Sequence, residues 1–191
     1  MRLHLNKPGV RALGVAESFR QGQRSSVLAG VVMRRDLVID GLGIGRTSVG
    51  GDDATASIVS LYRKFRRNDI NVILVSGAVL SLYNIVDVDE LALRTRVPTV
   101  CLTYKETSGI EGSIRRHFPE NFAQKLSSYR KLGKRRRVKL ASGHAVYVRG
   151  SGMDYIEVKP ILDMFTLQGS IPEPVRVARL LARAALVFRG S

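Results

Sequence analysis

The chain has 191 residues, about the length of one domain, and its 45% of hydrophobic residues is enough to bury a core, which excludes a disordered protein. Lys and Arg number 31 against 16 Asp and Glu, so the formal charge is +15. Because a charge this large attracts polyanions, we expect nucleic acid as a partner; a solvated, arginine-rich surface with no partner is the alternative.

The cysteine content and the lack of long apolar runs indicate the cellular compartment of the protein. Cys101 is the single cysteine, so the chain forms no internal disulfide and holds no cysteine-based zinc cluster. Residues 1–8 lack the apolar stretch of a signal peptide, and no apolar run is long enough to span a membrane. We therefore expect a cytoplasmic protein without membrane contacts.

The first half of the chain predicts a meander followed by alternating elements. Short β-branched runs between polar breaks predict three antiparallel strands, at residues 12–16, 26–33 and 37–44. After Gly50 and Gly51 the apolar spacing changes to that of a helix. The elements predicted next are a helix at 53–67, a strand at 72–75, a helix at 88–95 and a strand at 98–104.

The second half is predicted to be mainly helical. Its helices fall at residues 111–118, 120–132, 155–165 and 174–188. Strands that alternate with helices pair in parallel through crossover helices. We therefore predict an α/β fold, in which helices flank a mixed sheet made of an antiparallel meander and βαβ units. Residues 1–191 are expected to form a single domain, with a basic excursion or extra hairpin at about residues 130–152.

Positive charge is concentrated between Arg115 and Lys139, where ten Lys or Arg residues accompany one acid, Glu120. We identify the densest group as candidate phosphate ligands: Lys134, Arg135, Arg136, Arg137 and Lys139. The aromatic residues just before it are suited to stack bases: Phe118, Phe122 and Tyr129. Solvated helix faces and core packing explain the same residues without a ligand.

Asp52 and Asp53 stand at the start of the helix predicted after the glycine pair. Carboxylates there complement the helix dipole and cap backbone amides, which by itself accounts for them. The topology adds a second interpretation, because the ends of two predicted strands reach the same edge as this helix start. Two divalent ions held there by carboxylates would suit phosphodiester hydrolysis.

Six segments follow the order seen in the archaeal family called domain of unknown function 99. They are Gly14-Val-Ala-Glu-Ser-Phe19, Gly50-Gly-Asp-Asp-Ala-Thr55, Val75-Ser-Gly77, Tyr83-Asn-Ile-Val-Asp87, Pro98-Thr-Val100 and Gly169-Ser-Ile-Pro-Glu-Pro-Val-Arg-Val-Ala178. The resemblance spans about residues 12–188, and that family is similar to endonuclease V. It therefore implies an endonuclease-V-like domain with a ribonuclease H-like fold.

The chain departs from endonuclease V where that enzyme binds metal. Ala16 and Ser76 stand where the resemblance implies metal-binding aspartates, and Arg179 stands in place of a histidine. Glu17 is one residue beyond the first expected aspartate. In a regular strand Glu17 points to the face opposite Ala16, so it replaces the missing acid only if a bulge redirects it.

Two acids match what the resemblance implies about the metal site. Asp53, with Asp52 beside it, occupies the position that resembles the helical carboxylate of endonuclease V. If the chain is active, we expect Glu17 and Asp53 to be catalytic, and Glu17, Asp52 and Asp53 to hold Mg²⁺ or Mn²⁺. In the last helix, Arg176 and Arg179 share a face and are expected to reach the edge of the site and contact nucleic acid.

Three functions agree with these features. The one we favour is an endonuclease-V-like protein that binds DNA or RNA, has a degenerate metal site, needs no cofactor and has little or no cleavage activity. The second is an active endonuclease on damaged or deaminated nucleic acid, with Mg²⁺ or Mn²⁺ as cofactor. The third is a protein-interaction module on a nuclease scaffold, with a protein partner or a second copy of the chain.

Overall fold

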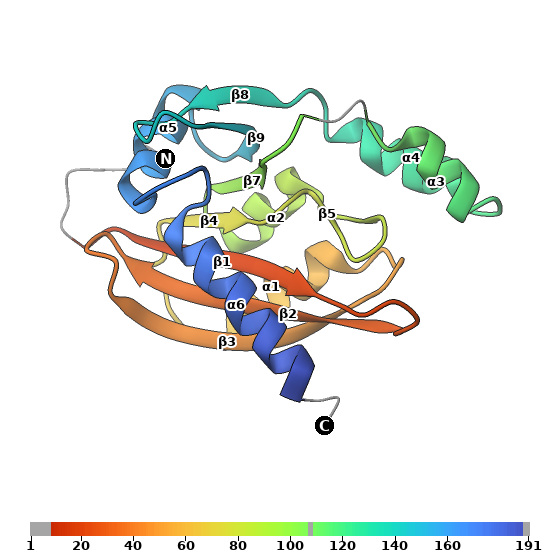
Figure 1. Cartoon of the computed structure of the whole chain (residues 1–191), viewed down its shortest axis with the longest axis horizontal. Helices are drawn as coiled ribbons and strands as arrows, with labels where there is room; N and C mark the ends of the chain where they lie inside the picture. Colours follow the sequence, from red (N-terminus) through yellow and green to blue (C-terminus); the bar gives the residue numbers. More distant parts are fainter. Residues whose placement is uncertain (1–8, 107–108, 189–191) are drawn as a thin grey trace.

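The computed structural model describes residues 9–106 and 109–188 (Figure 1). Residues 1–8, for which the sequence predicts no signal peptide, lie outside the described residues. The strands are β1 (Arg11–Ser18), β2 (Ser25–Arg34), β3 (Ile39–Ser48), β4 (Val72–Val75), β5 (Val79–Leu80), β6 (Asn84–Ile85), β7 (Thr99–Thr103), β8 (Arg136–Lys139) and β9 (Ala145–Ser151). The helices are α1 (Ala54–Lys64), α2 (Val88–Thr95), α3 (Glu111–His117), α4 (Phe122–Lys131), α5 (Tyr155–Phe165) and α6 (Glu173–Phe188).

A seven-stranded sheet in the order β3-β2-β1-β4-β7-β9-β8 forms the centre of the fold. Strands β1, β2 and β3 are an antiparallel meander, whereas β4 pairs in parallel with β1 and with β7. Helices α1 and α2 make the crossovers that these parallel pairs require. The predicted mixed sheet of a meander and βαβ units, flanked by helices, is confirmed.

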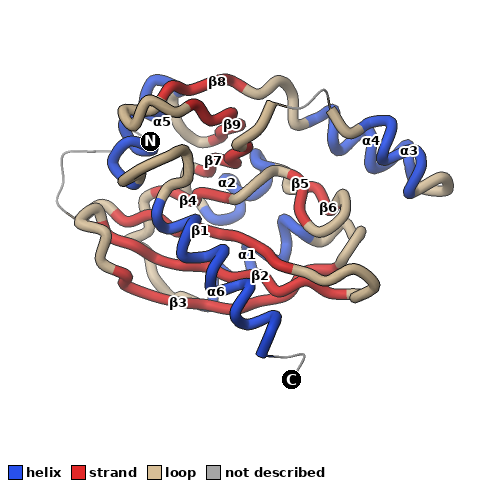
Figure 2. Tube along the Cα trace, viewed as in Figure 1, coloured by secondary structure: helices blue, strands red, loops and turns tan. Residues whose placement is uncertain are grey.

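Alternate residues of the strands supply two apolar layers. On one face Leu13 and Ile73 pack with Leu61 of α1. On the other face Leu74 packs with Phe165 of α5, and α6 crosses β1 and β2 (Figure 2). Since each helix covers one face, residues that are neighbours along a strand reach different helices.

Gly14 allows α6 to approach β1 closely. A Cβ at this position would clash with the backbone of Pro174, at the start of α6. The absence of a side chain at Gly14 therefore sets the depth at which α6 docks, and with it the position of Arg179 one turn further on.

The structure differs from the sequence prediction mainly at element ends. Helix α1 ends at Lys64, short of the predicted residue 67, and Arg66 is left-handed with φ 49°. Of the two alternatives predicted for residues 130–152, a basic excursion or an extra hairpin, the structure has the hairpin: β8 and β9 pair and extend the main sheet beside β7. Helices α3 and α4 project beyond the sheet (Figure 1). Within the described ranges, no helix has the length and apolarity needed to cross a membrane.

Candidate nucleic-acid site at the ends of the central strands

The pairing between β1 and β4 ends where β4 ends, and β1 continues to Ser18. Val15 pairs with Val75, and the amide of Ser76 donates to the carbonyl of Val15 at 2.8 Å. Ala16 is fully buried in the apolar cluster that includes α6. The hydroxyl of Ser76 accepts a hydrogen bond from Nε of Arg179 on α6, at 2.9 Å. The two positions at which the resemblance implies metal-binding aspartates therefore lie next to α6, and the Arg179 guanidinium lies beside Ser76.

Glu17 points the other way. Its pairing with Leu28 continues the β1–β2 ladder without a shift of register, so no bulge turns its side chain toward the Ala16 face. Its Oε2 accepts a hydrogen bond from the Ser26 hydroxyl at 2.8 Å, and its Oε1 accepts one from the Ser81 amide at 3.3 Å. The condition under which Glu17 would replace the missing aspartate is not met.

Asp53 joins three segments by hydrogen bonds. Its Oδ1 accepts from the Thr47 hydroxyl at 2.9 Å, the Ser48 amide at 3.0 Å and Nδ2 of Asn84 at 2.7 Å. Burial alone would raise the pKa of Asp53, but the bonds from Asn84, Ser48 and Thr47 outweigh it and lower the pKa below its usual value. Asn84, not Asp53, caps α1, because its Oδ1 accepts from the Ala54 amide at 2.9 Å.

Asp52 forms an ion pair with Lys125, whose side chain is buried. Lys125 is 2% exposed, and its Nζ lies 2.8 Å from Oδ1 of Asp52 and 2.9 Å from the Gly51 carbonyl. The same ammonium lies over the ring of Phe118, 4.7 Å from its centroid, and 3.4 Å from the Tyr83 carbonyl. This contact anchors the projecting α3–α4 pair to the glycine turn before α1.

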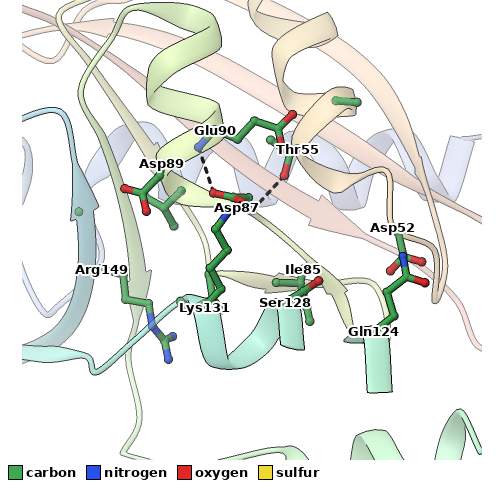
Figure 3. A pocket seen from close by; sticks show the side chains of 14 residues that line it. Asp52, Thr55, Ile85, Asp87, Asp89, Glu90, Gln124, Ser128, Lys131 and Arg149 are labelled. Atoms are coloured by element: carbon green, nitrogen blue, oxygen red, sulfur yellow. Dashed lines mark hydrogen bonds and ion pairs between the residues drawn. The ribbon is translucent and has the colours of Figure 1, made fainter. Parts of the chain in front are cut away.

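Asp52 also lines a cavity of about 330 Å³ between α1, α2 and α4 (Figure 3). Asp87, directly before α2, also lines this cavity and has partners of its own. Asp87 caps α2 by accepting from the Glu90 amide at 3.0 Å, and its Oδ2 lies 2.6 Å from Nζ of Lys131. The amide of Asp87 donates to Oγ1 of Thr55 at 2.9 Å. Asp52 and Asp87, two of the acids that line the cavity, are therefore already engaged in an ion pair or a helix cap.

The residues present do not fit a two-metal centre. The oxygens of Asp53 and Glu17 accept hydrogen bonds from protein donors, and Oδ1 of Asp52 is paired with the Lys125 ammonium. Within residues 9–106 and 109–188, no three His, Cys, Asp or Glu side chains lie where they could share a metal ion. Mg²⁺ requires oxygen ligands with lone pairs directed at it. The acids that the sequence marks as metal ligands are therefore engaged within the fold.

A pocket of about 440 Å³ opens instead next to Ser76, at the ends of β4 and β7. Its lining contains four cationic side chains: Lys105, Arg135, Arg149 and Arg179. It also contains the aromatic side chains Tyr104 and Tyr129. The described residues that line it include no aspartate and no glutamate. Like charges placed together without acids produce a strongly positive potential, which favours an anion.

The arginines of this cationic pocket, as we call it, are held in place. The guanidinium of Arg179 lies over the Tyr104 ring, 4.5 Å from its centroid. Nε and Nη2 of Arg149 both donate to the Gly133 carbonyl at 3.1 Å. Burial lowers the pKa of Arg149 and raises that of Tyr104 to about 12, so Tyr104 stays a protonated donor at neutral pH.

The basic residues predicted to bind nucleic acid divide between several places. Arg135 and Arg179 line the cationic pocket, whereas Lys134 and Arg136 line a neighbouring cavity of about 280 Å³. Arg137 and Lys139 lie exposed on β8. Arg176 was expected to reach the edge of the site, but its Nε pairs with Glu173 at 3.2 Å and its Nη2 donates to the Gln168 carbonyl at 3.1 Å.

Sequence reasoning missed two cations of the pocket. Lys105 follows the carboxyl end of a parallel strand, where ligands gather in sheets of this kind, so its position was a usable signal. No feature of the local sequence predicted a role for Arg149, because only the pairing of β9 with β7 brings this residue to the pocket.

Comparisons with known proteins agree with this architecture. The sequence profile of the Endonuclease dU family matches residues 8–186. A UPF0215 protein from Pyrobaculum calidifontis is 32% identical over 171 residues, which cover 89% of this chain and 93% of the relative. A crystal structure of a protein of unknown function from Archaeoglobus fulgidus aligns with TM-score 0.79 and 24% identity over 93% of this chain and 98% of that one.

Endonuclease V of Ciona intestinalis, solved in complex with DNA containing an inosine, aligns with TM-score 0.61 and 12% identity. The alignment covers 94% of this chain and 87% of the neighbour. Endonuclease V has a ribonuclease H-like fold, so this likeness confirms the fold that the sequence predicted. The profile match over nearly the whole length shows that the chain belongs to the Endonuclease dU family, with archaeal relatives and the fold of endonuclease V.

Proposed function

We propose that this protein binds nucleic acid along the edge that carries the cationic pocket, and that it has little or no metal-dependent cleavage activity. One observation carries the proposal: beside Ala16, where the resemblance implies a metal-binding acid, the Ser76 hydroxyl is bonded to Arg179. An arginine at this point attracts a phosphate and repels a divalent cation.

The charge distribution supports nucleic acid as the partner. Besides the four cations of the pocket, Lys134 and Arg136 line the adjacent cavity, so basic side chains continue from the strand ends to the edge strand β8. Phosphate contacts of this kind dominate affinity and make it fall steeply as salt rises. The fold neighbour from Ciona intestinalis is an endonuclease V in complex with DNA, which is consistent with this use of the scaffold.

Binding of labelled single-stranded and duplex DNA and RNA, measured over a series of salt concentrations, tests the proposal. We expect log affinity to fall linearly as log salt concentration rises. Arg149→Ala should make this slope shallower by the amount that corresponds to about one phosphate contact. Arg34→Ala is the matched control, because it removes the same charge from the exposed pair with Asp36 on the β2–β3 turn. Absence of binding at low salt, or equal losses in the two variants, would contradict the proposal.

The second candidate is a metal-dependent endonuclease acting on deaminated nucleic acid, and the name of the family, Endonuclease dU, favours it. Incubation of deoxyuridine- and inosine-containing oligonucleotides with Mg²⁺ or Mn²⁺ separates the two candidates. The proposal predicts no cleavage that depends on Glu17, so Glu17→Gln leaves any trace activity unchanged. Cleavage lost in Glu17→Gln, with unfolding temperature retained, would establish the second candidate.

A further inference from the structure

The cationic pocket differs in chemistry from the exposed basic surface around it. Its walls come from the ends of β4 and β7, from β9, from α4 and α6, and from the segment before β8. We infer that this pocket binds a terminal phosphate monoester, at the end of a nucleic-acid strand or on a free nucleotide, without a metal ion. The inference rests on the proposed function and makes it specific.

The number of charges favours a monoester over the phosphodiester of a continuous strand. A diester carries one negative charge, whereas a monoester carries about −1.5 to −2 near pH 7 and presents three strong acceptor oxygens. Lys105, Arg149 and Arg179 line the pocket together with Arg135, and the described residues of the lining include no aspartate and no glutamate. A dianion is the ligand that this excess of positive charge neutralises best.

Polar groups in the pocket are placed to donate. Arg179 uses Nε for Ser76, so the other nitrogens of its planar guanidinium are available for a fork-like contact with two oxygens. Ser76 accepts that bond, which leaves its own hydroxyl hydrogen to be donated. The buried hydroxyl of Tyr104 lies near Ser76 and has no hydrogen-bond partner of normal geometry within the described residues. An oxyanion beside Ser76 supplies the acceptors that these groups lack.

The apolar part of the lining fits the group attached to the phosphate. Leu102, Ile110 and Val79 line the pocket together with the ring of Tyr129. The volume of about 440 Å³ exceeds that of a bare phosphate and lies in the range of sites for small organic ligands. A terminal nucleotide therefore fits better than an inorganic anion, since its sugar or base covers the apolar wall.

The test compares oligonucleotides of one sequence that differ only at their ends. Affinities are measured at constant ionic strength for oligonucleotides with a 5′-phosphate, with a 3′-phosphate and with hydroxyl groups at both ends. The affinity for a nucleoside monophosphate alone is measured in the same way. We expect one phosphorylated end to bind about tenfold more tightly than hydroxyl ends, the gain of one charge-assisted hydrogen bond. Because the second pKa of a phosphate is about 6, the preference should fall as pH is lowered from 8 to 5.

Variants separate the pocket from the surface. Arg179→Met removes one cation of the binding edge, so it should weaken the binding of every oligonucleotide, and it should in addition abolish the preference for the phosphorylated end. Arg136→Ala is the control, because Arg136 lines the neighbouring cavity and lies over the Tyr155 ring. This variant should lower the affinity for all the oligonucleotides by the same factor. A preference that survives Arg179→Met would overturn the assignment.

The outcomes distinguish this inference from the proposed function. Equal affinities for phosphorylated and hydroxyl ends would remove the terminal-phosphate site and leave nucleic-acid binding intact. Binding of the nucleoside monophosphate without binding of any oligonucleotide would retain the pocket and remove the proposed function. Failure of both ligands to bind at low salt would overturn both.

Discussion

Asp53 gives the sharpest test, because its two interpretations predict opposite results for one substitution. If it is a metal ligand, Asp53→Ala removes catalysis and leaves the fold nearly intact. If it is the structural junction that the hydrogen bonds indicate, Asp53→Ala destabilises the protein. The change leaves the Thr47 hydroxyl, the Ser48 amide and Nδ2 of Asn84 without their shared acceptor.

The size of the effect follows from these three donors. Hydrogen bonds to a charged group contribute about 1.5–3 kcal/mol each, but Asp53 is partly exposed and water replaces some of what is lost. Asn84 also keeps its contacts with the Ser48 carbonyl at 2.8 Å and the Thr47 hydroxyl at 3.1 Å. We therefore expect a loss of about 2–4 kcal/mol in the free energy of unfolding. For a chain of this length that lowers Tm by roughly 5–15 °C.

Thermal unfolding and urea denaturation measure the loss directly. Asp89→Ala is the control, because Asp89 is an exposed carboxylate in the first turn of α2 and its removal should cost less than about 1 kcal/mol. An Asp53→Ala protein with the unfolding temperature of the parent, and with Mn²⁺-dependent cleavage abolished, would refute the structural role. It would assign the carboxylate to a metal ion instead.

Three further predictions concern the scaffold. Lys125→Met removes the ammonium that anchors α4 to Asp52, so hydrogen exchange in α3 and α4 should become faster while that in the sheet is unchanged; equal rates would contradict this. Hydrogen bonds from Arg67 and Arg11 lower the pKa of Asp40 to about 2, so its contribution to stability is full above about pH 4 and is lost as pH falls toward 2. Asp40→Asn should flatten the acid limb of stability plotted against pH, and an unchanged limb would place the effect elsewhere. Gly14→Ala places a Cβ against the α6 backbone and should lower Tm more than Gly22→Ala, where the Cβ meets open space but φ is +86°.

The elements predicted most accurately are those whose ends carry local signals. The sequence predicts β4 and α2 with the bounds that the structure has, since β4 is an apolar run and α2 is bounded by the Asp87 cap and by Arg96, which is left-handed with φ 56°. Strand β3 extends beyond its predicted end, because the polar Thr47 and Ser48 pair with Ser25 and Ser26 of β2, and no periodicity marks such pairing. The β8 strand is short, charged and at the sheet edge, so its apolar signal is weak.

The site could be predicted only in part, because its geometry depends on residues far apart in the chain. The resemblance identified Ala16 and Ser76 as departures from a metal site, and the structure places both beside α6. The Ser76–Arg179 bond joins positions 103 residues apart, and no local pattern predicts it. The role of Asp53 depends on Asn84, which is 31 residues away. Spacing identified the acids, but it could not show that Asp53 and Glu17 accept hydrogen bonds within the fold or that Asp52 pairs with Lys125.

The contact between Ser76 and Arg179 also determines what restoring one acid would do. A carboxylate at position 76 would lie within reach of the Arg179 guanidinium, and the two groups would form an ion pair in a partly buried setting. That pair would occupy the new oxygens, and the remaining cations of the pocket would still repel a divalent ion. We therefore expect Ser76→Asp to lower nucleic-acid affinity without creating a Mn²⁺ site, as measured by calorimetric titration with Mn²⁺. If Ser76→Asp alone bound Mn²⁺ tightly, the positive charge of Arg179 would not be the obstacle. A metal site at these strand ends should instead require acids at positions 16 and 76 together with removal of the charge at position 179.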